Sequence, residues 1–456
     1  MNGLPRCAEV AVQGPVARTF HYSVPEAMAG TIRLGQRVSV PFGPRILPGT
    51  VVGFPEASGT YTLKPIAAIR DPEPLLSEHL LALTKWISEH TLCAWSEALE
   101  AAVPSGARQG RQEATQVVVR PGVPPAEAKA AVERLRAEAP RQSRLLEILL
   151  ELEDPPLARD LERLARASRT SLEALARLGL VKLTREKATE DPLLSGEVVP
   201  EEPLPPTAEQ SAALAGILEL AEAPRFGVCL LHGITGSGKT EVYLQAIAKV
   251  LARGGQAIVL VPEIALTPQT VGRFRARFRE VAVLHSHLTD GQRHAQWAAI
   301  RSGAAKVVVG ARSAVFAPAP RLGLIVVDEE HETSFKQQSK PRYHARDVAV
   351  QRARLLGIPV VLGSATPSLE SYCLAKEGKE GTESGSRLLI LSERQGGGAL
   401  PPVTVIDMRR EIQERKRLHH LSVPLLDAVT QAVDEGGQVI LLLNRRGFAT
   451  AITCRR

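Results

Sequence analysis

The chain has 456 residues and a formal net charge of +7, with 44% hydrophobic and 23% charged residues. This composition is typical of a folded chain of about three domains and excludes intrinsic disorder as the main state. The excess of cations indicates an anionic partner without identifying it. Five widely spaced cysteines without a C-x-x-C pair favour a reducing cytoplasm over a disulfide framework. No apolar run is long enough to cross a bilayer, so we expect no membrane partner.

Residues 1–108 begin with short apolar runs separated by turn residues and end in helical patterns. Segments such as QRVSVPFG and GTVVGF predict short strands. The later segment SEHLLALTKWISEHTLCAW carries apolar residues at helical spacing. We therefore predict a β-rich domain that is closed by a pair of helices.

Residues 109–190 predict a second small domain. QVVVRPG is strand-like, and RQSRLLEILLELE is helical. The next segment predicts a helix, a break at Ser168, a second helix ending near Gly179, and a strand in VKLTRE. That order is typical of a winged helix, and a small helical spacer is the alternative. Residues 191–206 are rich in proline and acids and predict a linker.

Strands and helices alternate through residues 207–395. The apolar segments VCLLHG, AIVLVP, VAVLHS, KVVVG, LIVVDE and PVVLGS are separated by helical patterns. This alternation predicts a parallel sheet covered by helices on both faces, so the fold class is multidomain α/β. Residues 396–456 add a connection, one helix in SVPLLDAVTQAVDEG and one strand in QVILLLN.

The segment from Gly233 to Thr240 reads GITGSGKT and matches the phosphate-binding pattern G-x-x-x-x-G-K-[ST]. It follows a predicted strand and opens a predicted helix, so backbone N–H groups and the helix N-terminus can surround an anion. We predict that Lys239 reaches the β and γ phosphates of ATP and that the Thr240 hydroxyl ligates Mg²⁺. The alternative is a glycine-rich turn without a ligand. The predicted cofactor-binding residues of this loop are Gly233, Thr235, Gly236, Ser237, Gly238, Lys239 and Thr240.

Two acids, Asp328 and Glu329, stand at the end of the apolar strand in LIVVDEEH. We predict that Asp328 holds Mg²⁺ and that Glu329 orients or deprotonates the water that attacks the γ-phosphate. Together with Lys239 they are the predicted catalytic residues. Acids in this position can instead stabilise a helix N-terminus. The later segment VLGSATP is predicted to report the state of the γ-phosphate to other parts of the molecule.

These motifs resemble the first motor lobe of superfamily 2 helicases and, more narrowly, the PriA family of primosomal replication-restart helicases. The resembling segments include FHYSVP, VSVPFG, HGITGSGKTEVY, LVPEIALTPQ, GARSAVFAP, VVDEEHETSFKQQSKPRYHARDVA and LGSATPSLES. The resemblance implies a 3′-end DNA-binding domain in residues 1–108 and a RecA-like lobe in residues 207–395. It also implies ATP and Mg²⁺ as cofactors and 3′ to 5′ unwinding at stalled forks. Implied partners are DNA forks, single-stranded DNA, primosome proteins and single-strand-binding protein, and we expect a monomer.

The resemblance also implies roles for individual residues. Gln210 would read the adenine edge, because an amide donates and accepts at once. In the N-terminal domain the family usually has an acid at the position of His21, so this side chain is not expected to capture a 3′ end. A solvated surface loop is the alternative for the aromatic-rich segment, where two aromatic rings would stack on bases. The implied DNA-binding residues are Phe20, Tyr22, Glu263, Thr267, Gly310, Ala311, Arg312, Phe335, Lys336, Arg342 and Tyr343.

The second motor lobe of the family is expected to begin after residue 396, and residues 396–456 supply only its start. Arg445 and Arg446 match the entry to that lobe. The paired zinc-binding cysteines of the family would begin at Cys454, which alone cannot form a zinc site. We expect the chain to keep its DNA and nucleotide sites while unwinding is impaired. The alternative is a fork- and nucleotide-binding module without productive helicase activity.

Overall fold

The computed structural model falls into two units, Met1–Gly397 and Gly398–Arg456, and each is described by itself. The described residues are 5–14, 16, 18–56, 62–104, 115–152, 155–156, 158–165, 167–187, 198–222, 225–378, 385–395, 402–415 and 421–442.

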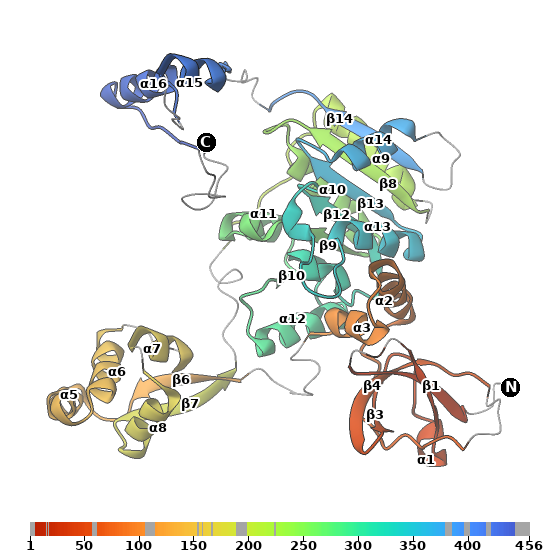
Figure 1. The fold of residues 1–456 in the computed structure, drawn as a ribbon, viewed down its shortest axis with the longest axis vertical. Coiled ribbons are helices and arrows are strands. Elements are labelled where there is room, and N and C mark those ends of the chain that lie inside the picture. Colours follow the sequence, from red (N-terminus) through yellow and green to blue (C-terminus); the bar gives the residue numbers. More distant parts are fainter. Residues whose placement is uncertain are drawn as a thin grey trace. The chain divides into compact units, whose positions relative to one another are not determined.

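The N-terminal region is an antiparallel five-stranded sheet in the order β2-β1-β4-β3-β5 (Figure 1). Val10, Val38, Val40 and Val51 are fully buried in its core and alternate with more exposed neighbours along β3 and β4. The predicted β-rich N-terminal region is therefore confirmed. The strands are β1 (Cys7–Val12), β2 (Phe20–Ser23), β3 (Arg37–Phe42), β4 (Arg45–Gly53) and β5 (Ala68–Ile69), with α1 (Glu26–Ala29) after β2.

Helices α2 (Glu78–Thr91) and α3 (Trp95–Ala102) share a hydrophobic core with the large parallel sheet. Leu80, Leu83 and Ile87 form one apolar stripe on α2, because residues three and four positions apart lie on the same face of a helix. This stripe belongs to the same buried cluster as Ile325 and Val360 of the sheet, and α2 contacts α13 (Ala345–Leu356). The helices that follow the N-terminal sheet thus pack on the large parallel sheet and on α13 as well.

A buried guanidinium joins these helices to the lobe. Arg352 of α13 is fully buried and donates hydrogen bonds to the carbonyls of Val315 (2.6 Å) and Ala317 (2.8 Å). Its Nη2 atom also lies 3.3 Å from Nε2 of His79 on α2. Burial first, and the charge of Arg352 second, lower the pKa of His79 from 6.5 to about 4. A neutral His79 can accept from Arg352, whereas a protonated one would repel it.

This pair predicts a pH-dependent stability. Between pH 4 and 6.5 the unfolded chain binds more protons at His79 than the folded chain, so this contribution is full above pH 6.5 and is lost as the pH falls towards 4. In a His79→Gln variant the thermal midpoint should therefore fall less steeply with acidification over that range than in the unmodified chain. His21→Gln, which alters an exposed histidine, is the control and should keep the original slope. Equal slopes in all three proteins would contradict the assignment.

Residues 115–187 form a separate layer of helices on a two-stranded antiparallel sheet. Strand β6 (Thr115–Pro121) pairs with β7 (Val181–Lys187), and Ser168 stands at the N-cap of α8. The predicted order of helix, break, helix and strand is present, and the assignment as a DNA-binding winged helix stays a prediction. The helices are α5 (Pro125–Glu138), α6 (Pro140–Glu151), α7 (Ala158–Ala165) and α8 (Arg169–Arg177).

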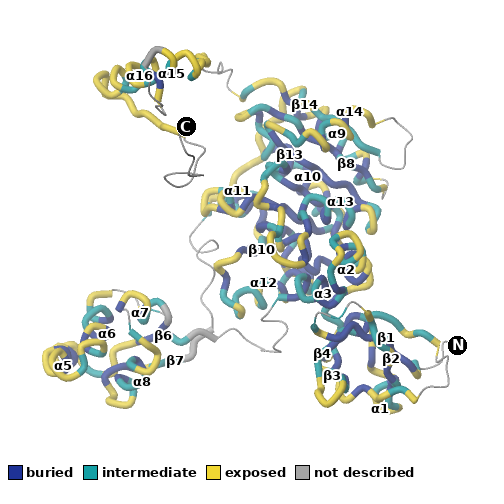
Figure 2. Tube along the Cα trace, viewed as in Figure 1, coloured by how far each residue is buried: buried dark blue, intermediate teal, exposed yellow. Residues whose placement is uncertain are grey.

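The predicted parallel-sheet lobe contains seven strands in the order β10-β11-β9-β12-β13-β8-β14. Leu230 and Val360 belong to one hydrophobic core and their neighbours Leu231 and Val361 to another, because successive side chains of a strand point to opposite faces. Helices α9 (Ala208–Glu222), α10 (Lys239–Ala252) and α11 (Pro268–Arg277) cover one face, and α13 and α2 cover the other. Figure 2 shows the central strands as buried, as expected for a sheet covered on both sides.

The remaining elements of the lobe complete the alternation of strands and helices. The predicted parallel-sheet lobe is thereby confirmed. The strands are β8 (Gly227–Gly233), β9 (Gln256–Leu260), β10 (Val281–Leu284), β11 (Val307–Gly310), β12 (Leu322–Asp328), β13 (Pro359–Ser364) and β14 (Ser386–Leu391). Between them lie η1 (Glu263–Ala265), α12 (Asp290–Ser302), η2 (Arg312–Phe316), η3 (Thr333–Phe335) and α14 (Leu369–Glu377).

The second unit contains α15 (Met408–Arg415) and α16 (Val423–Asp434). The predicted helix in SVPLLDAVTQAVDEG is confirmed by α16. The predicted strand in QVILLLN is wrong for its described part, residues 438–442, which has no regular structure. Ile440 and Leu442 are each 94% exposed, and no described strand pairs with them. A strand needs such a neighbour, because its N–H and C=O groups bond to another strand.

Candidate nucleotide and DNA sites

The register of the parallel sheet brings the predicted nucleotide residues to one edge. Asp328 at the end of β12 pairs with Gly363 of β13, and Ser364 at the end of β13 pairs with His232 of β8. The phosphate loop leaves β8 directly after His232. The acids, the GSAT segment and the phosphate loop therefore meet at the carboxyl ends of adjacent strands, where ligands bind in open α/β sheets.

The phosphate loop has the donors and the conformation that an anion site needs. Gly236 and Gly238 have φ angles of +82° and +81°, a backbone conformation that residues with a Cβ adopt only with strain. The Lys239 ammonium donates to the carbonyl of Gly233 (2.8 Å). The Ser237 hydroxyl is buried and has no hydrogen-bond partner among the described residues. These groups, at the N-terminus of α10, fit the phosphates of a nucleotide, and Thr240 with Asp328 could hold Mg²⁺.

Asp328 is held by a tyrosine that the sequence analysis did not select. The Tyr243 hydroxyl donates to Oδ1 of Asp328 (3.1 Å), and a Cβ on Gly363 would collide with that hydroxyl. Burial first, and the charge of Glu329 second, raise the pKa of Asp328 to about 6. Tyr243 lies four residues after Lys239 on α10, so its helical spacing from the motif was the available signal.

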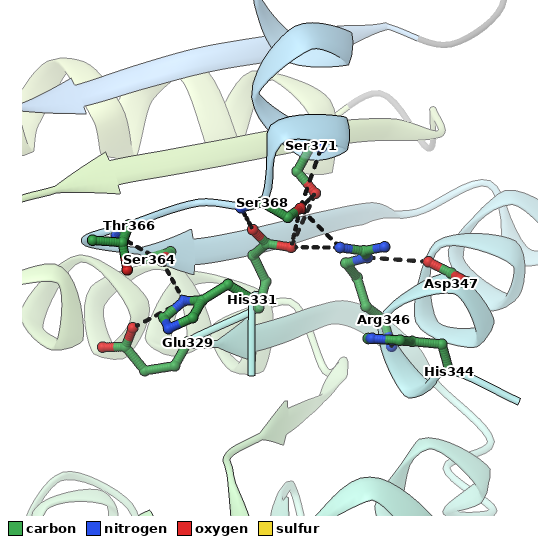
Figure 3. Close-up of polar contacts among 10 residues, drawn as sticks. Glu329, His331, His344, Arg346, Asp347, Ser364, Thr366, Ser368 and Ser371 are labelled. Carbon is green, nitrogen blue, oxygen red and sulfur yellow. Dashed lines mark hydrogen bonds and ion pairs between the residues drawn. The ribbon is translucent and has the colours of Figure 1, made fainter. Parts of the chain in front are cut away.

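The three acids at the carboxyl end of β12, Asp328, Glu329 and Glu330, have different environments, and Figure 3 shows Glu329 beside His331. Glu329 has φ +47°, an uncommon conformation for a residue with a side chain, and its carboxylate lies 3.7 Å from Nδ1 of His331. The same His331 atom lies 2.7 Å from the Ser364 hydroxyl, which also accepts from the N–H of Thr366 (3.0 Å). The acidic motif and the GSAT segment are therefore in direct contact.

Glu330 is fully buried, and its charge is compensated by Arg346. Its carboxylate accepts from Arg346 (3.0 Å), from the N–H and hydroxyl of Ser368 (2.6 and 3.1 Å) and from the Ser371 hydroxyl (3.0 Å). A buried carboxylate with this many donors is a structural anchor, since loss of Arg346 would leave its charge uncompensated. Sequence reasoning missed these partners because they lie 16 to 41 residues away in the chain.

Mg²⁺-dependent nucleotide binding should therefore depend on pH. As the pH falls through about 6, Asp328 takes up a proton and loses the charge that attracts Mg²⁺. At sub-saturating Mg²⁺, the gain in nucleotide affinity that Mg²⁺ provides should shrink over this range, as measured by equilibrium titration with a fluorescent nucleotide. Glu329→Gln removes the neighbouring charge and should move the midpoint to lower pH. A Mg²⁺ effect independent of pH in the unmodified chain would contradict the role of Asp328.

A second groove of about 290 Å³ contains part of the predicted DNA track. Glu263 from η1 and Arg312 from η2 both line it, together with Arg293 and Ser286, which the sequence analysis did not select. Arg312 also donates to the carbonyls of Ser334 (3.4 Å) and Lys336 (3.1 Å). Thr267 lies beside η1 at the N-cap of α11, and Gly310 and Ala311 are buried at the end of β11.

The aromatic-rich segment differs from the prediction. Phe335 and Tyr343 are 1% and 3% exposed and belong to the hydrophobic core of the lobe, so neither ring offers a face to a base in this structure. Their packing against apolar neighbours, such as Phe316 beside Tyr343, explains why aromatic residues recur in this segment. Lys336 and Arg342 are exposed, and the Lys336 ammonium donates to the Arg342 carbonyl (2.7 Å).

The N-terminal sheet carries a third open groove, lined mostly by β2, β3 and residues 62–64. Phe20 packs edge-to-face on Phe42 (5.2 Å between centroids), with the Arg18 guanidinium 5.1 Å from its centroid. His21 is exposed, whereas Tyr22 is buried and donates to the Pro41 carbonyl (3.3 Å). The predicted aromatic pair is therefore divided, with Phe20 at the groove and the Tyr22 ring mostly in the core.

The remaining predicted residues do not form a further site in the described part of the chain. Cys454, Arg445 and Arg446 lie outside the described residues. Over the described ranges, no three His, Cys, Asp or Glu side chains gather as metal ligands would. A search of the described helices finds none with the length and apolarity needed to cross a membrane.

Comparison with known proteins shows which family this chain resembles. Residues 9–104 match the family model of the PriA 3′ DNA-binding domain, and residues 207–373 match that of DEAD/DEAH box helicases. The chain is 36% identical to replication restart protein PriA of Bacillus subtilis (strain 168) over 96% of its own length. The chain belongs to the PriA family. PriA of Haemophilus influenzae is also 36% identical to it, over 98% of the chain.

The chain spans 62% of the Bacillus subtilis PriA and 60% of the Haemophilus influenzae PriA. Among solved structures, RecG bound to a three-way DNA junction is 24% identical over 52% of the chain and 29% of RecG, with a TM-score of 0.37. The match to the Bacillus subtilis PriA covers 96% of the chain and so includes both the N-terminal sheet and the parallel-sheet lobe.

Proposed function

We propose that the chain binds forked DNA and uses ATP hydrolysis to unwind it in the 3′ to 5′ direction during replication restart. The observation that carries this proposal is the meeting of the phosphate loop, Asp328 and Glu329 at one edge of the parallel sheet. Membership of the PriA family supports the choice of DNA as the track.

The chain's own residues supply the parts of phosphoryl transfer. The ammonium of Lys239 and the main-chain N–H groups at the start of α10 bind and orient the phosphates. Asp328 and Thr240 would hold Mg²⁺, which would supply positive charge to neutralise the phosphates. Glu329 accepts the proton of the attacking water. His331 contacts both Glu329 and Ser364, so a shift of the Glu329 carboxylate is transmitted to Ser364.

Arg312 provides a path from DNA to hydrolysis. It lines the groove of η1 and η2, and it donates to main-chain carbonyls of the segment that follows the acidic motif. A DNA strand lying in this groove would contact Arg312. Because Arg312 bonds to Ser334 and Lys336, this contact would be transmitted to the segment that begins at Glu329. We therefore expect DNA to stimulate ATP turnover.

The N-terminal groove is our proposed site for the end of a DNA strand. Arg18 and Lys64 line it beside Phe20, which combines cations for phosphate with an aromatic face for a base. Primosome proteins and single-strand-binding protein are the proposed partners, in keeping with the PriA family.

Two substitutions separate binding from hydrolysis. Lys239→Ala should abolish measurable nucleotide binding, because it removes the cation that meets the phosphates. Glu329→Gln should retain binding and lower ATP turnover by about 100- to 10,000-fold, the usual contribution of a general base. Both are measured with single-stranded DNA present and absent.

Strand displacement on forks with a 3′ or a 5′ single-stranded arm tests unwinding and its direction. Unwinding dependent on the 3′ arm supports the proposal, whereas unwinding dependent on the 5′ arm would contradict the proposed direction. Nucleotide and fork binding without DNA-stimulated turnover would replace the proposal by the alternative, a binding module without productive helicase activity.

Phe20→Ala tests the N-terminal groove. It should weaken binding to a fork with a terminal 3′ end by about 1 to 3 kcal/mol if a base stacks on this ring. Ile46→Ala, which removes an exposed apolar side chain of β4 outside the groove, is the matched control. Equal affinities of both variants for such forks in fluorescence anisotropy would remove the groove from the proposal.

A further inference from the structure

Residues 392–395, here called the strap, cross the phosphate loop immediately after β14. Strands β14 and β8 are parallel neighbours, and Leu391 pairs with Gly233. The N–H of Ile234 donates to the carbonyl of Leu391 (3.2 Å). The chain that leaves β14 therefore emerges beside the chain that leaves β8 to form the phosphate loop.

The strap donates hydrogen bonds to the main chain of the phosphate loop. Nε of Arg394 donates to the carbonyl of Thr235 (3.1 Å), and the N–H of Gln395 donates to the carbonyl of Gly236 (2.9 Å). In a trans peptide the carbonyl and the next N–H point in opposite directions. Holding the Thr235 carbonyl from the strap side therefore turns the Gly236 N–H away from the strap.

Helix α9 anchors both the strap and the phosphate loop. Glu209 accepts from the N–H and the hydroxyl of Ser392 (2.8 and 2.5 Å), and these bonds lower the pKa of Glu209. The next residue, Gln210, donates to the carbonyl of Ser237 (2.9 Å). Three consecutive carbonyls of the phosphate loop, at residues 235, 236 and 237, are thus each fixed by a donor outside the loop.

Gly238 shows how closely the strap approaches. A Cβ at this position would lie 2.7 Å from Nε2 of Gln395 and even closer to Nε2 of Gln210. The two amide side chains therefore pack on the last glycine before Lys239. Together with the φ of +81°, this packing leaves room only for glycine.

We propose that the strap is a positioning element of the nucleotide site, with Arg394 and the main-chain N–H of Gln395 holding the phosphate loop in its anion-binding conformation. This inference rests on the proposed nucleotide site. Donors that are already oriented cost no reorganisation when a phosphate arrives. Coupling between two sites is reciprocal, so a bound nucleoside diphosphate must in turn stabilise the strap. The chain continues from the strap towards residue 398.

The test compares matched variants of the full chain by their equilibrium dissociation constants for a fluorescent ADP analogue. Arg394→Met and Gln395→Pro each remove one donor to the loop, and the dissociation constant should rise by about 2- to 12-fold, the usual net effect of one hydrogen bond. Arg394→Lys keeps a cationic donor and Gln395→Ala keeps the N–H, so both should remain close to the unmodified chain. Lys376→Met, on the exposed surface of α14, controls for loss of a cation.

Hydrogen exchange supplies a readout that a purely structural role would not change. ADP should slow amide exchange in peptides covering residues 392–395 of the unmodified chain, and this protection should be reduced in Arg394→Met. Unchanged ADP affinity in both Arg394→Met and Gln395→Pro, or no ADP-dependent protection, would overturn the strap. If Lys239→Ala still abolishes binding in that case, the nucleotide site stands without the strap. If Lys239→Ala binds ADP normally, the proposed function itself fails.

Discussion

The functional edge of this protein depends on the parallel register of β12, β13, β8 and β14. Parallel strands all end at the same edge of their sheet, so every segment that follows one of them begins near its neighbours. Asp328, Ser364, Gly233 and Leu391 end four such strands in adjacent positions. The proposed nucleotide site, the GSAT segment and the strap therefore all begin at this one edge of the sheet.

Three consecutive acids at this edge, Asp328, Glu329 and Glu330, differ in burial and in the way their charge is stabilised. Asp328 keeps a raised pKa of about 6, because it is desolvated beside Glu329. Glu329 stays partly exposed in a left-handed backbone conformation. Glu330 is fully buried, and the donors of α13 and of the segment after β13 stabilise its charge. The three carboxylates therefore differ in their partners although they are consecutive in the chain.

Buried polar links also connect this lobe to the N-terminal region. Arg352 bonds to the main chain of η2 at Val315 and lies beside His79 of α2, while Arg312 of η2 bonds to the segment after the acidic motif. The segment around η2 therefore contacts α3 and, through Arg312, the segment that follows the acidic motif. Arg312, a proposed DNA-binding residue, and His79 of α2 are therefore connected through η2 and Arg352.

The sequence by itself determined the elements and the chemistry that local patterns encode. GITGSGKT predicts a phosphate loop because its glycines and lysine act within one turn, and apolar periodicity predicts the parallel lobe and the β-rich N-terminal region. Only the tertiary structure decided which side chains meet across long separations, such as Tyr243 with Asp328, or Arg394 with Thr235. It also decided burial: Phe335, Tyr22 and Tyr343 were predicted to contact DNA and lie in the core, because an aromatic ring suits a base and an apolar core equally well. The strand predicted in residues 438–442 was wrong for the same kind of reason, since pairing depends on a neighbour that a local pattern does not contain.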